Sequence, residues 1–135
     1  MNRVAPLRKR SPKNTIADER RAKAVARIRV MALNNGMCEV CAMLPATDFA
    51  HRLAKSRGGK WQASNGLMTC RPCHQAQRDG LGGERVATAL GQVLPSLIDG
   101  VAPDPERVPV SCVYGWTYLT DDGDVIPATG AVMMT

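Results

Sequence analysis

Residues 51–74, HRLAKSRGGKWQASNGLMTCRPCH, contain both histidines of this 135-residue chain, one at each end of the stretch. Asn65 stands between the histidines, and the pair Cys70 and Cys73 runs directly into the second histidine, His74. Imidazole and thiol groups are the titratable and metal-binding side chains that proteins use most often. The two histidines can meet only if the chain folds back between them, so this stretch decides the fold.

The stretch and its flank predict a strand, a loop, a second strand and a helix, in that order. Residues 47–50 and 66–69 are short runs of strand character, and the loop between them contains Gly58-Gly59. Residues 70–79 follow without a break as a helix that carries His74. The predicted fold class is therefore α+β, with a ββα unit at its centre.

A second CxxC pair upstream completes a metal-binding pattern. Cys38 and Cys41 precede Cys70 and Cys73, and four thiolates paired in this way suit a tetrahedral Zn²⁺. Four sulfur ligands leave no open position for water, so the predicted zinc is structural. A redox-active CxxC of thioredoxin type is the rival interpretation, and it does not explain two pairs in one small domain. The fifth cysteine, Cys112, lies in an apolar run and is predicted to be a small buried hydrophobic residue.

Charge is spread unevenly along the chain, whose formal net charge is +6. Residues 1–30 hold ten Lys and Arg against two acids, whereas residues 81–135 hold two against seven. This distribution indicates a polyanionic partner such as nucleic acid, with solubility as the alternative explanation. No apolar run reaches the roughly 20 residues of a membrane span, and the first residues lack the apolar centre of a secretory signal. We therefore expect no membrane contact, a cytoplasmic location and reduced cysteines.

Four segments are expected along the chain. Residues 1–14 predict a flexible basic arm, and residues 15–36 a basic helix that opens on a Thr15–Asp18 capping box. Residues 37–80 form the core. Residues 81–135 predict an extension, with a short helix over residues 84–94 and a β-hairpin whose strands are residues 110–120 and 124–126.

Periodicity predicts which faces of these elements are apolar. The amino-terminal helix is expected to pack through one apolar stripe, and its basic residues to form a solvated or DNA-facing surface. The stripe consists of Ile16, Ala24, Val25, Ile28, Met31 and Ala32, and the basic residues are Arg20, Arg21, Lys23, Arg27 and Arg29. In the hairpin, Tyr114, Trp116 and Tyr118 are expected on one face, because alternate residues of a strand share a side.

Together these motifs resemble the HNH endonucleases, which have the ββα-metal fold. The resemblance is close over residues 37–79 and looser on both sides, where the chain is similar to small HNH proteins of tailed bacteriophages. It implies a metal-dependent endonuclease that hydrolyses DNA phosphodiester bonds, by nicking or by cutting both strands. Little sequence specificity is expected, because no helix carries Arg, Asn and Gln at base-reading spacing. The matching positions are Cys38, Cys41, His51, Gly58, Gly59, Asn65, Cys70, Cys73 and His74.

The resemblance also implies a role for each polar residue of the site. His51 is the general base, Asn65 holds the loop and orients His51, and His74 binds a catalytic divalent ion. That ion is Mg²⁺ or Mn²⁺, or alternatively Ni²⁺ or Zn²⁺. Many members carry a second metal ligand immediately before the base, where this chain has Ala50. Asp48 lies two residues earlier, on the same side of an extended strand, and is the candidate substitute.

The loop and the flanks are expected to meet the partner. Trp61 either packs the loop or stacks on nucleic acid, and a set of basic residues meets the phosphate backbone unless it is an ordinary polar loop. That set is Arg52, Lys55, Arg57 and Lys60. The implied partners are DNA and a phage terminase large subunit in the bacterial host, with the chain a monomer or weak dimer. Two other functions stay open, a non-catalytic zinc-stabilised DNA-binding module and a packaging adaptor.

Overall fold

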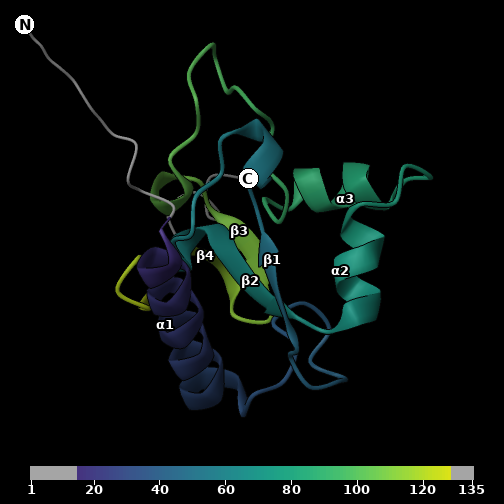
Figure 1. Ribbon diagram of the computed structural model, residues 1–135. Helices are drawn as coiled ribbons and strands as arrows, with labels where there is room; N and C mark the ends of the chain where they lie inside the picture. Colours follow the sequence, from purple (N-terminus) through teal and green to yellow (C-terminus); the bar gives the residue numbers. More distant parts are fainter. Residues whose placement is uncertain (1–14, 129–135) are drawn as a thin grey trace, which may run out of the picture.

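A computed structural model describes residues 15–128, and the predicted basic arm at residues 1–14 lies outside them (Figure 1). Three helices and two small antiparallel sheets make up the fold, which confirms the α+β class. The helices are α1 (Ile16–Asn34), α2 (Arg71–Gln77) and α3 (Gly83–Ala89). The strands are β1 (Asp48–His51), β2 (Gly66–Thr69), β3 (Val110–Cys112), β4 (Gly115–Leu119) and β5 (Val125–Pro127).

The centre of the molecule is a two-stranded sheet followed directly by a helix. β1 pairs with β2 in antiparallel register, with Asp48 opposite Thr69 and His51 opposite Gly66. Cys70 is the N-cap of α2, so the helix begins where β2 ends. The order of strand, loop, strand and helix is therefore as predicted, although the first strand begins one residue later than expected.

Helix α1 has the predicted ends but not the predicted packing face. Thr15 and Asp18 form the capping box, and Asn35 ends the helix in the left-handed region with φ of 54°. The apolar stripe was wrong, because Ile16 and Ile28 are 70% and 69% exposed. The side chains that α1 buries are Ala22, Ala26, Arg29 and Val30. The small alanine side chains let α1 approach its neighbours closely, and the arginine is buried on the same face. A search for apolar periodicity gives little weight to alanine and none to arginine, so it did not find this face.

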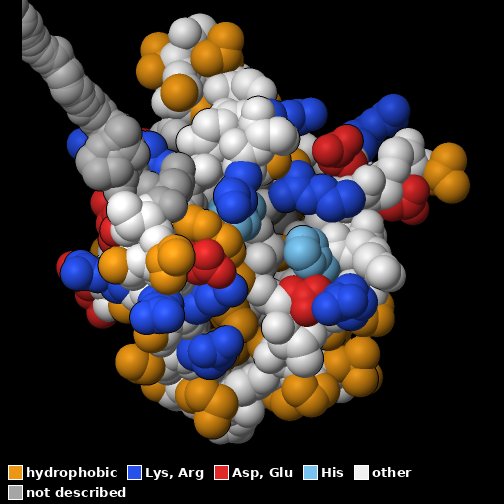
Figure 2. All heavy atoms as spheres, viewed as in Figure 1, with side chains coloured by type: hydrophobic (Ala, Val, Ile, Leu, Met, Phe, Trp, Pro, Cys, Tyr) orange, Lys and Arg blue, Asp and Glu red, His pale blue; other side chains and the backbone are white. Residues whose placement is uncertain are grey.

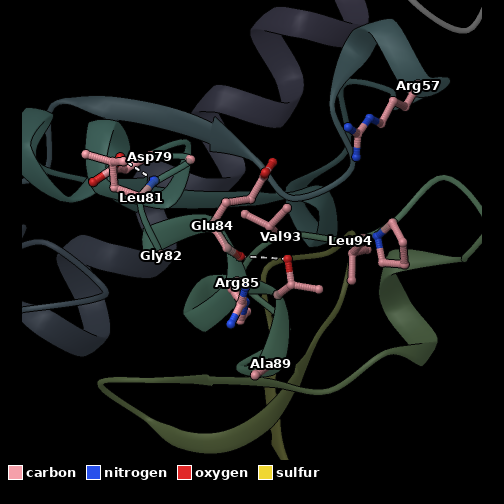
Figure 3. A pocket seen from close by; sticks show the side chains of 12 residues that line it. Arg57, Asp79, Leu81, Gly82, Glu84, Arg85, Ala89, Val93 and Leu94 are labelled. Carbon is pink, nitrogen blue, oxygen red and sulfur yellow. Dashed lines mark hydrogen bonds between the residues drawn. The ribbon is translucent and has the colours of Figure 1, made fainter.

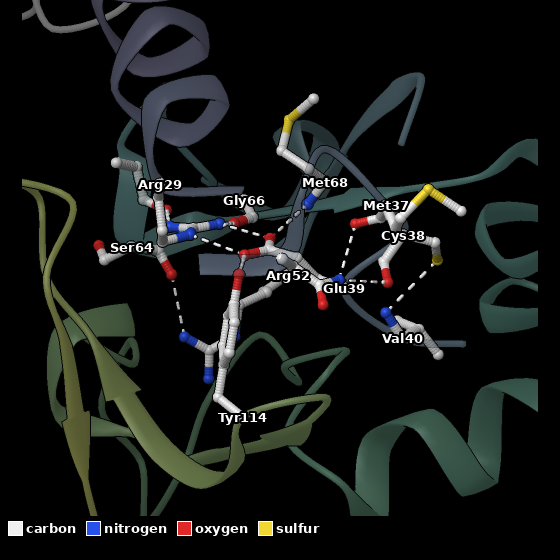
Figure 4. A network of polar contacts seen from close by, with 12 residues as sticks. Arg29, Met37, Cys38, Glu39, Val40, Arg52, Ser64, Gly66, Met68 and Tyr114 are labelled. Carbon is white, nitrogen blue, oxygen red and sulfur yellow. Dashed lines mark hydrogen bonds and ion pairs between the residues drawn. The ribbon is translucent and has the colours of Figure 1, made fainter. Parts of the chain in front are cut away.

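A buried ion pair joins α1 to the first CxxC (Figure 4). Arg29 Nε and Nη2 donate to the two carboxylate oxygens of Glu39 at 2.9 and 2.7 Å, and neither side chain is exposed. The other Arg29 donors bind carbonyl oxygens of Ala63 and Gly66. Glu39 also accepts from the backbone N–H of Met68 and, through its second oxygen, from a tyrosine hydroxyl. Every strong polar group of the pair thus has a partner, as burial of charge requires.

A second arginine, Arg52, is also buried, so its predicted contact with DNA phosphate is wrong. It follows β1 directly, and its guanidinium donates to four backbone carbonyls at 2.8–3.0 Å. Burial lowers its pKa to about 10, which leaves the group charged at neutral pH. Arg52 ties the ββα unit to the later chain, since its acceptors belong to Ser64, Gly91, Pro105 and Val108.

The carboxy-terminal extension is a three-stranded sheet rather than the predicted hairpin. β4 pairs with both β3 and β5, because a turn at Val113 and Tyr114 splits the expected first strand. Tyr114 therefore leaves the predicted aromatic row, and its hydroxyl donates to Glu39 at 2.7 Å. Helix α3 is likewise shorter than predicted and stops before Gly91, whose φ is +72°.

The extension shares its core with the ββα unit. Leu67 of β2 packs with Val110 and Leu119 in one fully buried cluster. Cys112 packs against this cluster as a partly buried residue, and burial raises the pKa of its thiol to about 11. Residues 81–128 are therefore structural support for the ββα unit, not a separate folding unit.

Candidate metal site and histidine groove

The four paired cysteines come together as the spacing predicts. The Sγ atoms of Cys38, Cys41, Cys70 and Cys73 all lie within 4.8 Å of one another, and those of Cys41 and Cys70 are 3.8 Å apart. Sulfur atoms bound to zinc at about 2.3 Å in a tetrahedron are separated by about 3.8 Å. These cysteines could therefore hold a structural metal ion such as zinc.

The backbone around the first pair is arranged to support thiolates. The N–H groups of Val40 and Cys41 point at Cys38 Sγ from 3.4 and 3.5 Å, and Met43 N–H donates to Cys41 Sγ at 3.4 Å. The Met43 contact is the main reason that the pKa of Cys41 is lowered to about 7. All five cysteines of the chain are free thiols, so the cluster has no competing disulfide.

His51 and His74 line one groove on the surface of the molecule. His51 is the last residue of β1, and His74 lies in the first turns of α2, so the ββα order places them together. Figure 2 shows both histidines near the centre of one face with Lys and Arg side chains around them. The other lining residues of the groove are Phe49, Ala54, Lys55, Ser56, Arg57 and Arg78.

The imidazole of His51 is held in an aromatic and cationic environment. Its ring contacts Trp61 and Phe49 edge-on, with centroids 4.4 and 5.2 Å away. The Nε2 atom is buried and has no hydrogen-bond partner within residues 15–128. Burial, followed by the charges of Lys55 and Arg78, lowers the pKa of His51 to about 4. The imidazole of His51 is therefore neutral at neutral pH, and no described residue forms a hydrogen bond with its Nε2.

This environment predicts a pH-dependent contribution to stability. Because the folded pKa of His51 lies below its ordinary value of 6.5, the unfolded chain takes up a proton that the folded chain refuses between about pH 6.5 and 4. The contribution is present above this window and is lost as the pH falls through it. Urea unfolding at about pH 7 and about pH 5 should show a larger loss for the wild type than for His51→Gln. Equal losses in the two proteins would contradict the assignment.

His74 contacts the carboxylate that was predicted as a second metal ligand. Its Nδ1 lies 3.0 Å from Oδ2 of Asp48, and Arg71 Nε donates to the same oxygen at 2.7 Å. The Arg71 guanidinium holds the pKa of Asp48 well below its usual range, with a smaller contribution from His74. Ala50, the residue before His51, is buried. Asp48 and His74 thus meet, and Ala50 contributes nothing to the groove.

Asn65 closes the loop between the two strands. Its Oδ1 accepts from Leu53 N–H at 2.8 Å, and its Nδ2 donates to the carbonyls of Leu53 and Lys60. The side chain holds the loop as expected, but its hydrogen bonds within residues 15–128 go to Leu53 and Lys60 and not to the ring of His51. The two loop glycines are required, because Gly58 has φ of +94° and a Cβ on Gly59 would lie 1.8 Å from the Leu53 carbonyl oxygen.

The basic residues of the groove are partly those predicted. Lys55, Arg57 and Lys60 are exposed, in contrast to the buried Arg52. Lys55 and Lys23 of α1 each place their ammonium over the ring of Trp61, at 5.3 and 5.0 Å, so the packing interpretation of Trp61 is favoured. Sequence reasoning missed Arg78 as a residue of this groove, and it missed Lys23 and Arg71, which line the adjacent hollow that His74 also borders. Of these three residues, only Arg78 could have been found from the sequence, because it lies one helical turn after His74.

A hollow larger than the histidine groove lies elsewhere on the described surface, beside α3 (Figure 3). It measures about 900 Å³ and is lined by mixed charges, among them Arg57, Asp79, Glu84 and Arg85. It contains no histidine or cysteine, so it offers neither a neutral base nor a soft metal ligand. Arg57 also lines the histidine groove and is the one described residue that lines both hollows.

Comparison with known proteins does not identify the chain. No family model matches it, and neither the curated proteins nor the solved structures give a significant match. Within the described residues, no helix is long and apolar enough to cross a membrane.

Proposed function

We propose that the chain is a metal-dependent endonuclease of the HNH type that hydrolyses phosphodiester bonds in DNA. The observation that carries the proposal is the position of the neutral His51 imidazole at the end of β1. It lies in one groove with His74 and several cationic side chains. A neutral base can activate water, an imidazole can bind a divalent ion, and positive charge stabilises the phosphate, so these groups together suit phosphodiester hydrolysis.

In this proposal His51 takes the proton from a water molecule as that water attacks phosphorus. The P–O3′ bond breaks and the departing 3′ oxygen takes a proton from solvent water, which leaves a 5′-phosphate and a 3′-hydroxyl. Lys55, Arg57 and Arg78 line the groove and attract the phosphate backbone. Asn65 keeps the loop closed, and the sheet pairing keeps His51 beside Gly66.

His74 would hold the catalytic divalent cation, Mg²⁺ or Mn²⁺, with Ni²⁺ and Zn²⁺ as alternatives. Its imidazole suits a divalent metal, and the neighbouring Asp48 carboxylate adds negative charge to that side of the groove. Such an ion would stabilise the negative charge that develops on the phosphate oxygens. The cysteine cluster is a separate site, because four thiolates support the fold and leave no position for substrate.

The wider setting rests on the similarity to phage HNH proteins. It supports a phage origin, a role in the host cytoplasm and an association with a terminase large subunit during DNA packaging. The buried Ala50 favours a second candidate, a non-catalytic DNA-binding module, because the position of the usual second ligand is empty of polar groups. A packaging adaptor would retain the same fold and bind a protein partner without cutting DNA.

Plasmid nicking tests the proposed function. Zinc-loaded protein is incubated with supercoiled plasmid without added ion and then with Mg²⁺, Mn²⁺ or Ni²⁺. We expect nicked circles only with an added ion, and a rate reduced about 100-fold or more in His74→Ala. The control is Arg85→Ala, an exposed residue outside the histidine groove. If plasmid is bound but stays supercoiled under every condition, the chain is a DNA-binding module and the nuclease proposal is wrong.

A further inference from the structure

The carboxylate of Asp48 is fully occupied by donors from its own chain. Oδ2 accepts from Arg71 Nε at 2.7 Å and contacts His74 Nδ1 at 3.0 Å. Oδ1 accepts from the Thr47 hydroxyl at 3.0 Å and more weakly from Arg71 Nη2 at 3.3 Å. An ionised carboxylate can only accept hydrogen bonds, so the contact with His74 requires the proton to be on Nδ1. In the neutral ring, Nε2 then carries the free lone pair.

We propose that Asp48 is a positioning residue that fixes the Nδ1–H form of His74 and leaves Nε2 as the atom that binds a divalent cation. Asp48 is thus not itself the second metal ligand. The identity of the cation rests on the proposed function, whereas the orientation of His74 does not. Histidines that bind metals commonly donate their other nitrogen to a carboxylate in this way.

The exposed fractions of the three side chains support this assignment of His74 as the ligand and Asp48 as the positioning residue. Asp48 is 10% exposed, His74 34% and Arg71 68%, so the carboxylate is the most deeply placed of the three. The imidazole is therefore more accessible to an ion in solvent than the carboxylate is. Figure 2 shows an acidic and a basic side chain directly beside one of the histidines. Arg71 and His74 are three residues apart on α2, which places them on the same helix face toward β1.

The arrangement also explains how the site can work without a ligand at position 50. Arg71 donates to both oxygens of Asp48, so the carboxylate keeps a partner when His74 binds an ion. Loss of the Asp48 charge should release the ring of His74, and loss of Arg71 should loosen the carboxylate. The single imidazole nitrogen would leave most of the coordination positions to water and to phosphate oxygens, as Mg²⁺ prefers.

The tautomer of His74 can be measured directly by ¹⁵N NMR of the zinc-loaded protein at about pH 8. We expect the wild type to show a protonated Nδ1 and an unprotonated Nε2. Asp48→Asn should lose this preference, and Arg71→Gln should weaken it. The control Asp122→Asn removes an exposed carboxylate on the turn before β5 and should leave His74 unchanged. A wild-type His74 with its proton on Nε2 would overturn the proposal.

Binding of Mn²⁺, followed by the broadening of the His74 ring signals, is the second readout. We expect affinity to fall about 10- to 100-fold in Asp48→Asn while binding at His74 persists. Loss of binding in Asp48→Asn with an unchanged tautomer would make Asp48 a direct ligand and reject the proposal. If the tautomer and Mn²⁺ results are as expected but no plasmid is cut, the proposed nuclease fails and the orienting role of Asp48 stands.

Discussion

Cys70→Ser is expected to abolish the cooperative unfolding transition of the protein. Cys70 is buried and belongs to both the metal cluster and the start of α2. Structural zinc binding is worth about 10–16 kcal/mol in small zinc domains, whereas a domain of this size has about 5–15 kcal/mol of stability in all. Loss of one thiolate should therefore leave a chain whose folded state is no longer favoured at 25 °C. Circular dichroism on heating and zinc content by mass spectrometry measure both effects.

The chain contains its own matched control for this experiment. Cys112→Ser makes the same chemical change at the one cysteine outside the cluster. Placing a hydroxyl in this partly apolar position should cost about 1–3 kcal/mol, and the zinc content should stay at one ion per chain. A wild type that carries no zinc, or a Cys70→Ser variant that melts like the wild type, would reject the structural metal site.

Glu39→Gln is expected to lower the free energy of unfolding by about 3–5 kcal/mol. The substitution preserves shape but leaves the Arg29 guanidinium buried without its counter-charge, at 0% exposure. It also disturbs the hydrogen bonds that Glu39 accepts from Met68 and Tyr114, and so the junction of α1, β2 and the β3–β4 turn. Urea unfolding followed by tryptophan fluorescence gives the change directly.

An exposed ion pair on α1 is the control for the buried Arg29–Glu39 pair. Glu19 pairs with Lys23 one helical turn away, with both side chains more than a third exposed. Because exposed pairs contribute little, Glu19→Gln should leave the unfolding midpoint close to that of the wild type. If Glu39→Gln is as mild as Glu19→Gln, the buried ion pair does not have the structural role assigned to it.

The local elements could be predicted from the sequence because short-range chemistry determines them. The capping box of α1, both strands of the ββα unit and the helix after Cys70 follow from neighbouring residues. The cysteine cluster was predicted because each CxxC is itself a local turn, and two such turns suit one ion. The places of His51, Asn65 and His74 came from the family resemblance, and the structure brings the histidines to one groove.

The errors come from long-range polar contacts, which no pattern in the sequence reveals. Arg29 and Arg52 resemble every other basic residue of this chain, yet both are buried because distant acceptors surround them. Tyr114 was placed in a continuous strand, but its hydroxyl turns to Glu39 and the strand divides. The predicted apolar stripe of α1 failed for the same reason, since the packing face is built around Arg29. Only the tertiary structure decides which charges of a basic protein meet solvent.

The most direct test of the nuclease proposal is the single-turnover cleavage of supercoiled plasmid by His51→Ala beside the wild type, with Mn²⁺ present and DNA binding measured in parallel. Loss of a general base typically lowers a rate about 10²- to 10⁴-fold. We expect a decrease of this size, with plasmid affinity and zinc content unchanged, because His51 lies in the groove and not in the cysteine cluster. Equal cleavage by both proteins, or cleavage by neither while both bind plasmid, would contradict the role of His51 as the base of a DNA endonuclease.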